Sequence, residues 1–278
     1  MDKKGKKKTK KRLKLRMKVV GKILLVILVI CALFAYINNL DTKNIVIKGN
    51  TNIKDVEIIE TADIKNYPKI FKINIKKTEN KIKKIDLVET VKIKRNLLGK
   101  LTIEIEENDI LFYYKYNQKY ITDNKKELKD NKEIIGYPTL INFTPNTAYD
   151  ELVKGLSKID NNIIKMIDEI EYTPYKNGDG EVIEESFLYT NARFTLHMKD
   201  ENTVIIDTVN IKRLQNYPKI FTSLKMDETK GILELDTISD KKDEDVETYF
   251  FRSYESVAAA EKEKAKKEEE KKKEQGEQ

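Results

Sequence analysis

One apolar run constrains this chain more than any other stretch. Residues 23–37 (ILLVILVICALFAYI) contain no charged side chain, and the run extends back to Val19 with Lys22 as its only charge. These roughly 19 residues give about 28 Å of α-helix, which suffices for a hydrocarbon core of about 30 Å. A lysine one turn from the end of a helix can reach the headgroups. We therefore predict one membrane-spanning helix over residues 19–38.

A cleaved secretory signal is the main alternative, because it also has a basic front and an apolar centre. This run is longer than a usual signal core, and it ends in the bulky residues Phe34, Tyr36 and Ile37. No small-x-small cleavage site follows it. Cys31 raises the alternative of a lipoprotein, but Ile30 before it is not small. An uncleaved anchor fits these features best.

The charge before the run predicts its orientation. Residues 1–22 carry twelve Lys and Arg against a single Asp, which is a net charge of +11. The positive-inside rule then places the N-terminus in the cytoplasm and the remainder of the chain outside the plasma membrane. The whole chain has a net charge of +7, so residues 23–278 carry −4. The basic pI therefore gives little support for nucleic-acid binding.

The residues that usually build catalytic and metal sites are scarce. Cys31 and His197 are the only cysteine and histidine, so Cys/His zinc clusters and intramolecular disulfides have no residues to form from. Glu104 and Glu106 share one face of a predicted strand, where they fit a solvent-facing surface. Residues 177–180 (NGDG) have a calcium-like composition but fit a hairpin turn. We predict no catalytic residue, no cofactor and no metal site.

The elements predicted just after the anchor follow the order strand–helix–helix–strand–strand. The first strand ends in a Gly-Asn turn, and Thr51 or Asn52 can cap the helix that follows. The predicted elements are a strand at 45–50, a helix at 53–61, an extended segment at 67–75, a helix from Thr78, and strands at 88–95 and 101–107.

The chain beyond residue 109 is rich in short alternating patterns that predict strands. The predicted strands are 110–116, 119–122, 138–143, 167–172, 185–189, 193–198, 203–206, 231–236 and 248–253, with helices at 148–159 and 209–224. Residues 256–278 are Lys, Glu and Ala with almost no large apolar side chain, which predicts a disordered segment or a frayed helix.

These patterns resemble the FtsQ/DivIB family of bacterial cell division proteins. Three segments are similar in sequence to strands of that family's POTRA domain: Ile45–Asn50, Val88–Arg95 and Leu101–Glu107. One difference is that family members often have a proline before the second of these strands, and Asp86–Glu89 contains none. The resemblance implies an α+β fold with one N-terminal transmembrane helix, a β-α-α-β-β POTRA domain, and a mixed, mainly antiparallel β domain with a late helix. The predicted divisions are a basic, structureless cytoplasmic segment 1–18, the transmembrane helix 19–38, the POTRA domain 41–109, the β domain 110–255 and the charged tail 256–278.

The predicted partner-binding site is the aromatic segment TYFFRSY: Thr248, Tyr249, Phe250, Phe251, Arg252, Ser253 and Tyr254. As the last strand of its sheet, it would leave an aromatic edge open to a partner strand. The resemblance implies such a partner, because family members receive a strand from FtsB/DivIC, which pairs with FtsL. The alternative interpretation is that the two phenylalanines pack beneath the domain.

The resulting functional prediction is a non-enzymatic, single-pass scaffold at the division septum. It would bind and stabilise the FtsL–FtsB(DivIC) pair outside the membrane, without a small-molecule substrate or nucleic acid. The alternative is an exported membrane-anchored enzyme, such as a Ser-Lys peptidase or a cell-wall hydrolase. The six serines of the chain show no recognisable signature for it.

Overall fold

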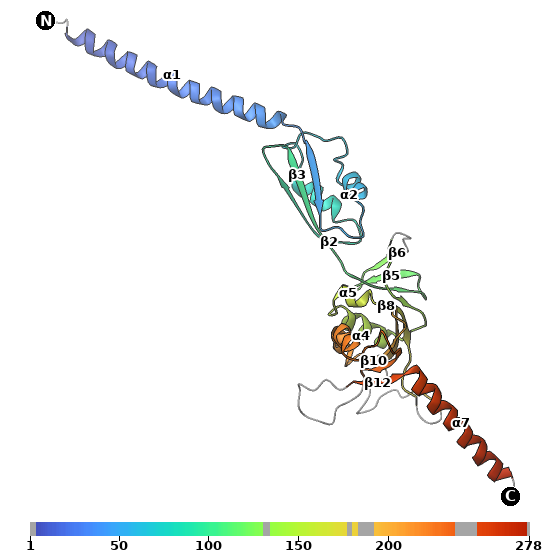
Figure 1. Ribbon diagram of the computed structural model, residues 1–278. Helices are drawn as coiled ribbons and strands as arrows, with labels where there is room; N and C mark the ends of the chain where they lie inside the picture. Colours follow the sequence, from blue (N-terminus) through green and yellow to red (C-terminus); the bar gives the residue numbers. More distant parts are fainter. Residues whose placement is uncertain (1–3, 130–133, 177–179, 183–191, 237–248, 277–278) are drawn as a thin grey trace. The chain divides into compact units, whose positions relative to one another are not determined.

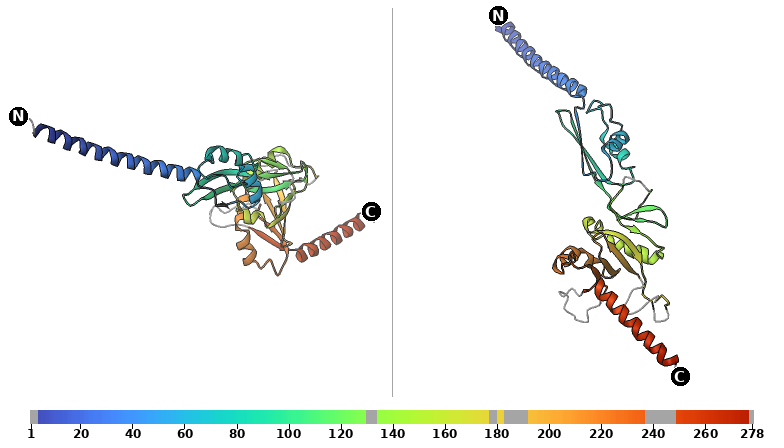
Figure 2. Two further views of the ribbon diagram at one scale, coloured as in Figure 1. Left: turned by 90° about the horizontal axis from the view of Figure 1, so that it is seen from above. Right: turned by 45° about the vertical axis from the view of Figure 1, so that its right-hand side comes forward.

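The computed structural model describes residues 4–129, 134–176, 180–182, 192–236 and 249–276 (Figure 1). The chain folds into two compact units, Met1–Glu107 and Asn108–Gln278. Each unit has a sheet of its own. Figure 2 shows the same elements from two further directions.

The first unit begins with a long helix, α1 (Lys4–Asn39). Residues Met17–Asn39 of this helix are long and apolar enough to cross a membrane, with a mean hydropathy of 2.7. The helix also continues through the basic segment, so the prediction of a structureless segment was wrong for residues 4–18. Lys, Arg and Leu are good helix formers, and they extend a helix that the apolar run has already nucleated.

The predicted β-α-α-β-β order follows in the same unit. Its elements are β1 (Asn44–Lys48), α2 (Asp55–Ala62), α3 (Ile75–Ile82), β2 (Val88–Arg95) and β3 (Lys100–Glu107). The strand order is β1-β3-β2, with β1 parallel and β2 antiparallel to the central β3. Alternate side chains of β3, including Leu101, Ile103 and Ile105, are buried, as expected for a sheet with one face covered by helices.

Two local predictions in this unit were wrong. Neither Thr51 nor Asn52 caps α2, which begins at Asp55 after Lys54 and has no side-chain cap. The backbone amides of residues 51–53 donate instead to the carboxylate of Glu107. The segment 67–75, predicted to be extended, is irregular, with a turn at residues 70–72 and a single bridge from Lys69 to Asp41. The helix after it starts at Ile75, three residues earlier than predicted, because the side chain of Asn74 caps it.

The second unit is built on one nine-stranded sheet. Its strands are β4 (Ile110–Tyr114), β5 (Lys119–Thr122), β6 (Glu127–Lys129), β7 (Thr139–Leu140), β8 (Ile167–Tyr172), β9 (Arg193–Met198), β10 (Thr203–Asp207), β11 (Gly231–Glu234) and β12 (Phe250–Ser253). The order is β12-β11-β10-β9-β8-β7-β4-β5-β6. The pairs β4–β7, β7–β8 and β10–β11 are parallel and the others antiparallel, which confirms the predicted mixed sheet. The predicted strand at 185–189 lies outside the described residues.

The helices of this unit are α4 (Asn146–Leu156), α5 (Asn161–Ile164), the 3-10 helix η1 (Ile211–Asn216), α6 (Tyr217–Ser223) and α7 (Tyr254–Gly276). The late helix predicted at 209–224 is thus divided into η1 and α6, and Pro218 lies in the first turn of α6, where a missing N–H costs little. Leu152 of α4, Leu214 of η1 and Tyr217 of α6 share one buried core with strand residues such as Phe112.

Candidate partner-binding edge

Strand β12 is the outermost strand at one end of the nine-stranded sheet. It pairs with β11 in antiparallel register, with Phe251 opposite Leu233. Among the described residues no further strand pairs with its other side. The opposite end of the sheet is β6, a three-residue strand with Glu127 and Lys129 exposed, and short charged edges of this kind discourage pairing.

Hydrogen bonds around β11 show which backbone groups of β12 face outward. The amide of Tyr254 donates to the carbonyl of Lys230 at 3.1 Å, and the amide of Leu235 donates across to Ile205 of β10 at 2.8 Å. Bonded and non-bonded pairs alternate along an antiparallel ladder. Phe251 therefore occupies a non-bonded position, and its N–H and C=O point away from β11 toward the open edge.

The side chains of β12 alternate between the core and the solvent. Phe251 packs against the hydrophobic core, over Gly231 of β11, where an added Cβ would lie 2.9 Å from the phenylalanine ring. Phe250 points the other way and is 54% exposed. The guanidinium carbon of Arg252 lies 5.8 Å from the centre of the Phe250 ring. The strand thus presents one aromatic ring to solvent and anchors itself with the next.

The remaining residues of the predicted site flank this strand. Tyr249 packs against the core. The hydroxyl of Ser253 accepts a hydrogen bond from the amide of Ser256 in α7. Tyr254 begins α7, and its hydroxyl lies 2.8 Å from that of Thr203. Thr248 lies outside the described residues.

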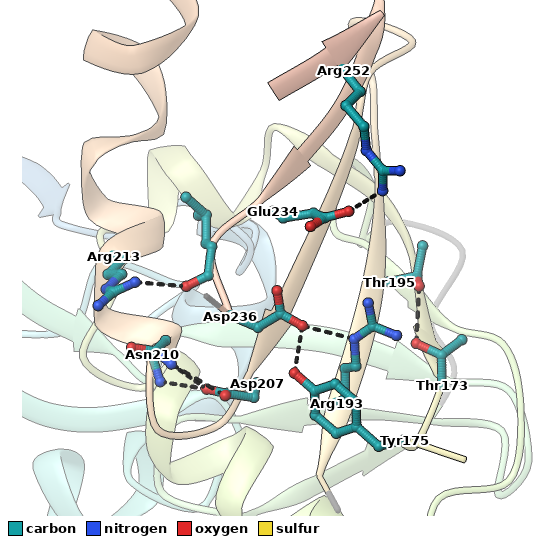
Figure 3. A network of polar contacts seen from close by, with 11 residues as sticks. Thr173, Tyr175, Arg193, Thr195, Asp207, Asn210, Arg213, Glu234, Asp236 and Arg252 are labelled. Carbon is teal, nitrogen blue, oxygen red and sulfur yellow. Dashed lines mark hydrogen bonds and ion pairs between the residues drawn. The ribbon is translucent and has the colours of Figure 1, made fainter. Parts of the chain in front are cut away.

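A buried polar network holds the end of β11 in place (Figure 3). Asp236 is 5% exposed. Its carboxylate accepts hydrogen bonds from Arg193 Nε at 2.8 Å and from the Tyr175 hydroxyl at 2.5 Å. Burial, and then the bond to Asp236, raise the pKa of Tyr175. On β11 itself, Glu234 forms an ion pair with Arg252 of β12.

A second group of contacts in Figure 3 fixes η1 beside the same strand end. Asp207 accepts from the amide of Asn210 at 2.7 Å and from its side chain at 2.9 Å. Arg213 donates to the carbonyl of Leu235 at 3.1 Å. Burial raises the pKa of Asp207. Sequence reasoning missed the group around Asp236, because Arg193 and Tyr175 are 43 and 61 residues away from it along the chain and form no motif.

The other groups considered from sequence occupy ordinary positions. His197 is on β9 with Nε2 3.8 Å from Glu171 Oε2, and both side chains are well exposed. Glu104 forms an ion pair with Lys94 at 2.6 Å, and this hydrogen bond is the main cause of its lowered pKa. Glu106 accepts from Thr90 Oγ1. The turn predicted at 177–180 lies largely outside the described residues.

The serines in the described part of the chain bond to the backbone. The hydroxyls of Ser157, Ser223 and Ser256 donate to the carbonyls of Lys154, Ile220 and Ser253, respectively. In the same described residues, no group of three or more His, Cys, Asp or Glu side chains could hold a metal ion.

Comparison with known proteins shows which family model and which proteins this chain is similar to. Residues 40–108 match the family model described as POTRA domain, FtsQ-type. DivIB of Bacillus subtilis is 29% identical over 252 residues, covering 86% of this chain and 84% of that protein. DivIB of Staphylococcus aureus is 27% identical over 198 residues, covering 68% of this chain but only 42% of its own length.

A solved structure is also similar: the major extracytoplasmic domain of the trans isomer of DivIB from Geobacillus stearothermophilus. It is 20% identical and covers 43% of this chain and 96% of that one, with a TM-score of 0.32. That score is too low to support an argument about the fold.

The fold and the family match define a protein with an N-terminal apolar helix and an FtsQ-type POTRA domain. More particularly, the chain is similar to the DivIB cell division proteins, which confirms the resemblance predicted from the sequence. These homologues support a role in cell division, and the apolar helix fits a single-pass membrane protein.

Proposed function

We propose that this protein is a non-enzymatic scaffold of the division machinery at the septum, which binds the FtsL–FtsB(DivIC) pair outside the membrane. The DivIB homologues support the division role, and helix α1 supports the anchor. The observation that carries the binding proposal is the open edge of β12, where the backbone of Phe251 faces outward and Phe250 is exposed. The division into cytoplasmic, membrane and outer segments is part of the same proposal.

In this proposal, a strand of the partner extends the sheet beyond β12. Its backbone pairs with the outward N–H and C=O of Phe251, each bond contributing about 0.5–1.5 kcal/mol. Backbone bonds of this kind supply affinity without sequence preference, and side-chain contacts supply specificity. Phe250 and Arg252 form the exposed face against which a partner side chain can pack. The ion pair between buried Asp236 and half-buried Arg193 helps to keep β11, and therefore this edge, in a fixed position.

The test is to replace Phe250 with lysine in the full chain and to measure recovery of the FtsB/DivIC-like partner. Exposed aromatic residues at the centre of an interface are frequent binding hot spots, so Phe250→Lys is expected to weaken binding about tenfold or more. Phe250 is preferable to Phe251 or Tyr249, because those two pack against the core and their loss would disturb folding.

A matched control is available in the same unit. Phe143 is 58% exposed and lies away from β12, in the segment between β7 and α4. Phe143→Lys is expected to leave partner recovery unchanged. Equal recovery with Phe250→Lys and with the unaltered chain would move the binding surface elsewhere.

Depletion of the protein in its own cells tests the division role separately. Cells are expected to filament as septation fails, because the scaffold no longer stabilises its partners. Normal septation after complete depletion would contradict the division role.

A further inference from the structure

The loop between β2 and β3 presents two leucines to solvent. Leu97 is 64% exposed and Leu98 is 79% exposed. The loop has a defined conformation, because the side-chain oxygen of Asn96 accepts hydrogen bonds from the amides of Leu98 and Lys100, both at 2.9 Å. Two adjacent aliphatic side chains held outward by a fixed turn carry an energetic cost in water. We call residues 96–99 the leucine tip.

The leucine tip lies against the chain segment that leaves the membrane helix. The carbonyl of Gly99 accepts hydrogen bonds from the amides of Lys43 at 2.8 Å and Asn44 at 3.3 Å. Gly99 has a φ of +84°, and a Cβ there would lie 2.8 Å from the carbonyl oxygen of Asp41. Only glycine permits this close approach. The tip is therefore fixed to residues 41–44, which begin two residues after α1 ends.

No free linker separates α1 from the POTRA domain. Leu40 is buried, and its carbonyl accepts from the amide of Ile70 at 2.9 Å. The hydroxyl of Thr42 donates to the carbonyl of Pro68 at 2.5 Å. Lys69 Nζ donates to the side-chain oxygen of Asn39, the last residue of the helix, at 2.9 Å. The POTRA domain thus holds the chain in place from Leu40, the first residue after α1.

This junction keeps the leucine tip close to the lipid for any tilt of the helix. Lys43, which bonds to the tip, is four residues beyond Asn39, so at most about 14 Å of chain separates them. The span of 23 residues is about 35 Å long, somewhat more than the hydrocarbon core of about 30 Å, so α1 ends among the headgroups. The leucines therefore lie within reach of the outer lipid interface.

The charges around the leucine tip favour an anionic surface. Lys43 and Lys100 flank the tip and are exposed. The nearby acid is Asp41, whose carboxylate lies 3.9 Å from Lys69 Nζ. Arg95, at the end of β2, directs its guanidinium to the carbonyls of Ile70 and Ile73. Lysines close to a membrane surface attract anionic headgroups.

We propose that the leucine tip inserts into the outer lipid interface beside α1, with Lys43 and Lys100 on anionic headgroups. Helix α1 and the tip then form two separate contacts with one bilayer. Two contacts fix the orientation of the POTRA domain on the membrane, whereas a helix alone leaves it free to rotate. This inference does not depend on the partner-binding role of β12.

The chain has no tryptophan, so a single tryptophan at the tip is an unambiguous reporter. The full chain carrying Leu98→Trp is reconstituted into vesicles of phosphatidylcholine and phosphatidylglycerol with brominated acyl chains. We expect its emission to shift to shorter wavelength and to be quenched by the bromines. The control is Val56→Trp, at another exposed aliphatic position (61% exposed) of the same unit. Val56 lies in α2, which follows β1. We expect the tryptophan at this position to emit as in water, without quenching.

The two parts of the proposal are overturned by different results. If Leu98→Trp is quenched no more than Val56→Trp, insertion is wrong. A tip that shifts its emission only when a partner protein is added would also overturn insertion, and would make the tip a protein-binding surface. Adding Lys43→Glu and Lys100→Glu should reduce quenching in the anionic vesicles, and unchanged quenching would overturn the headgroup contact. Circular dichroism of each variant checks that the fold is retained.

Discussion

At the residue scale, Glu107 shows how one side chain at the end of β3 holds the turn that precedes α2. Its carboxylate accepts from the amides of Thr51 at 2.8 Å, Asn52 at 2.9 Å and Ile53 at 3.1 Å. Hydrogen bonds to a charged group contribute about 1.5–3 kcal/mol. We expect Glu107→Ala to lower the free energy of unfolding of the POTRA domain by about 2 kcal/mol, and to speed hydrogen exchange at these three amides. The neighbouring Glu106→Ala, which loses only a bond to Thr90, is the control and should leave their exchange unchanged.

Tyr149 gives a prediction about alkaline pH. Its ring stacks on Tyr114 with centroids 5.4 Å apart, and burial, followed by the charge of Glu127, raises its pKa from 10.0 to about 12. The unfolded chain releases this proton near pH 10 while the folded chain holds it, so the contribution to stability is complete below pH 10 and is lost as the pH rises to about 12. Urea unfolding at several alkaline pH values should show a smaller decline for Tyr149→Phe than for the unaltered chain.

The exposed Tyr116 supplies the control for that measurement, since it is 69% exposed. Tyr116→Phe should follow the unaltered chain across the same pH range. An identical decline in all three proteins would show that Tyr149 titrates like an exposed tyrosine.

At the element scale, helix α4 and η1 are packed so closely that a glycine is required inside a helix. A Cβ at Gly155 would lie 2.5 Å from Ile211 Cγ2. Gly-to-Ala inside a helix normally stabilises by about 1 kcal/mol, but here we expect the overlap to destabilise the unit by about 1–3 kcal/mol. Chemical unfolding measures the effect. In the double variant with Ile211→Ala, the two losses should be less than additive, and simple additivity would contradict the proposed overlap.

At the scale of the whole molecule, the charge before α1 predicts which end faces outward. In a Cys31→Ala background, Lys225→Cys, at a side chain 71% exposed, should react with a membrane-impermeant maleimide on intact cells. Lys8→Cys, in the basic segment, should react only after the membrane is permeabilised. The reverse pattern would place the domains in the cytoplasm and would contradict the proposed role outside the membrane.

Much of the architecture could be predicted because the signals are local. The apolar run identifies the helix that is apolar enough to cross a membrane. Alternation over Val91–Ile93 and Leu101–Ile105 helps to identify β2 and β3 almost to the residue. The aromatic strand β12 was also found, from its aromatic residues and its position between two charged segments. Segments without a clear period were less well predicted, and residues 209–224 form η1 and α6 instead of one helix.

The candidate edge could be predicted only in part. Sequence located the aromatic segment but could not tell that Phe251 packs inward while Phe250 faces solvent. That outcome depends on the register with β11, where the ring of Phe251 lies over Gly231. The ion pair of Asp236 and Arg193 gave no signal, because 43 residues separate its members and only the folded sheet brings them together.

The hexapeptide NYPKIF occurs twice in the chain and adopts two different conformations. At Asn66–Phe71 it is irregular, with Tyr67 at a φ of +48° and Ile70 bonded to Leu40. At Asn216–Phe221 it ends η1 and continues into α6, with Tyr217 buried. Six residues carry too little local preference to select one conformation, so the surrounding contacts select it.

The sequence by itself determined the apolar run of α1, the basic segment before it and the order of most strands and helices, since these follow from composition and periodicity. Only the tertiary structure decided that β12 has an unpaired side among the described residues, and which of its aromatic rings is exposed to solvent. It alone also showed that two exposed leucines lie beside the end of the membrane helix. The reason is physical: exposure and proximity are properties of contacts between distant segments, and no local pattern in the chain encodes them.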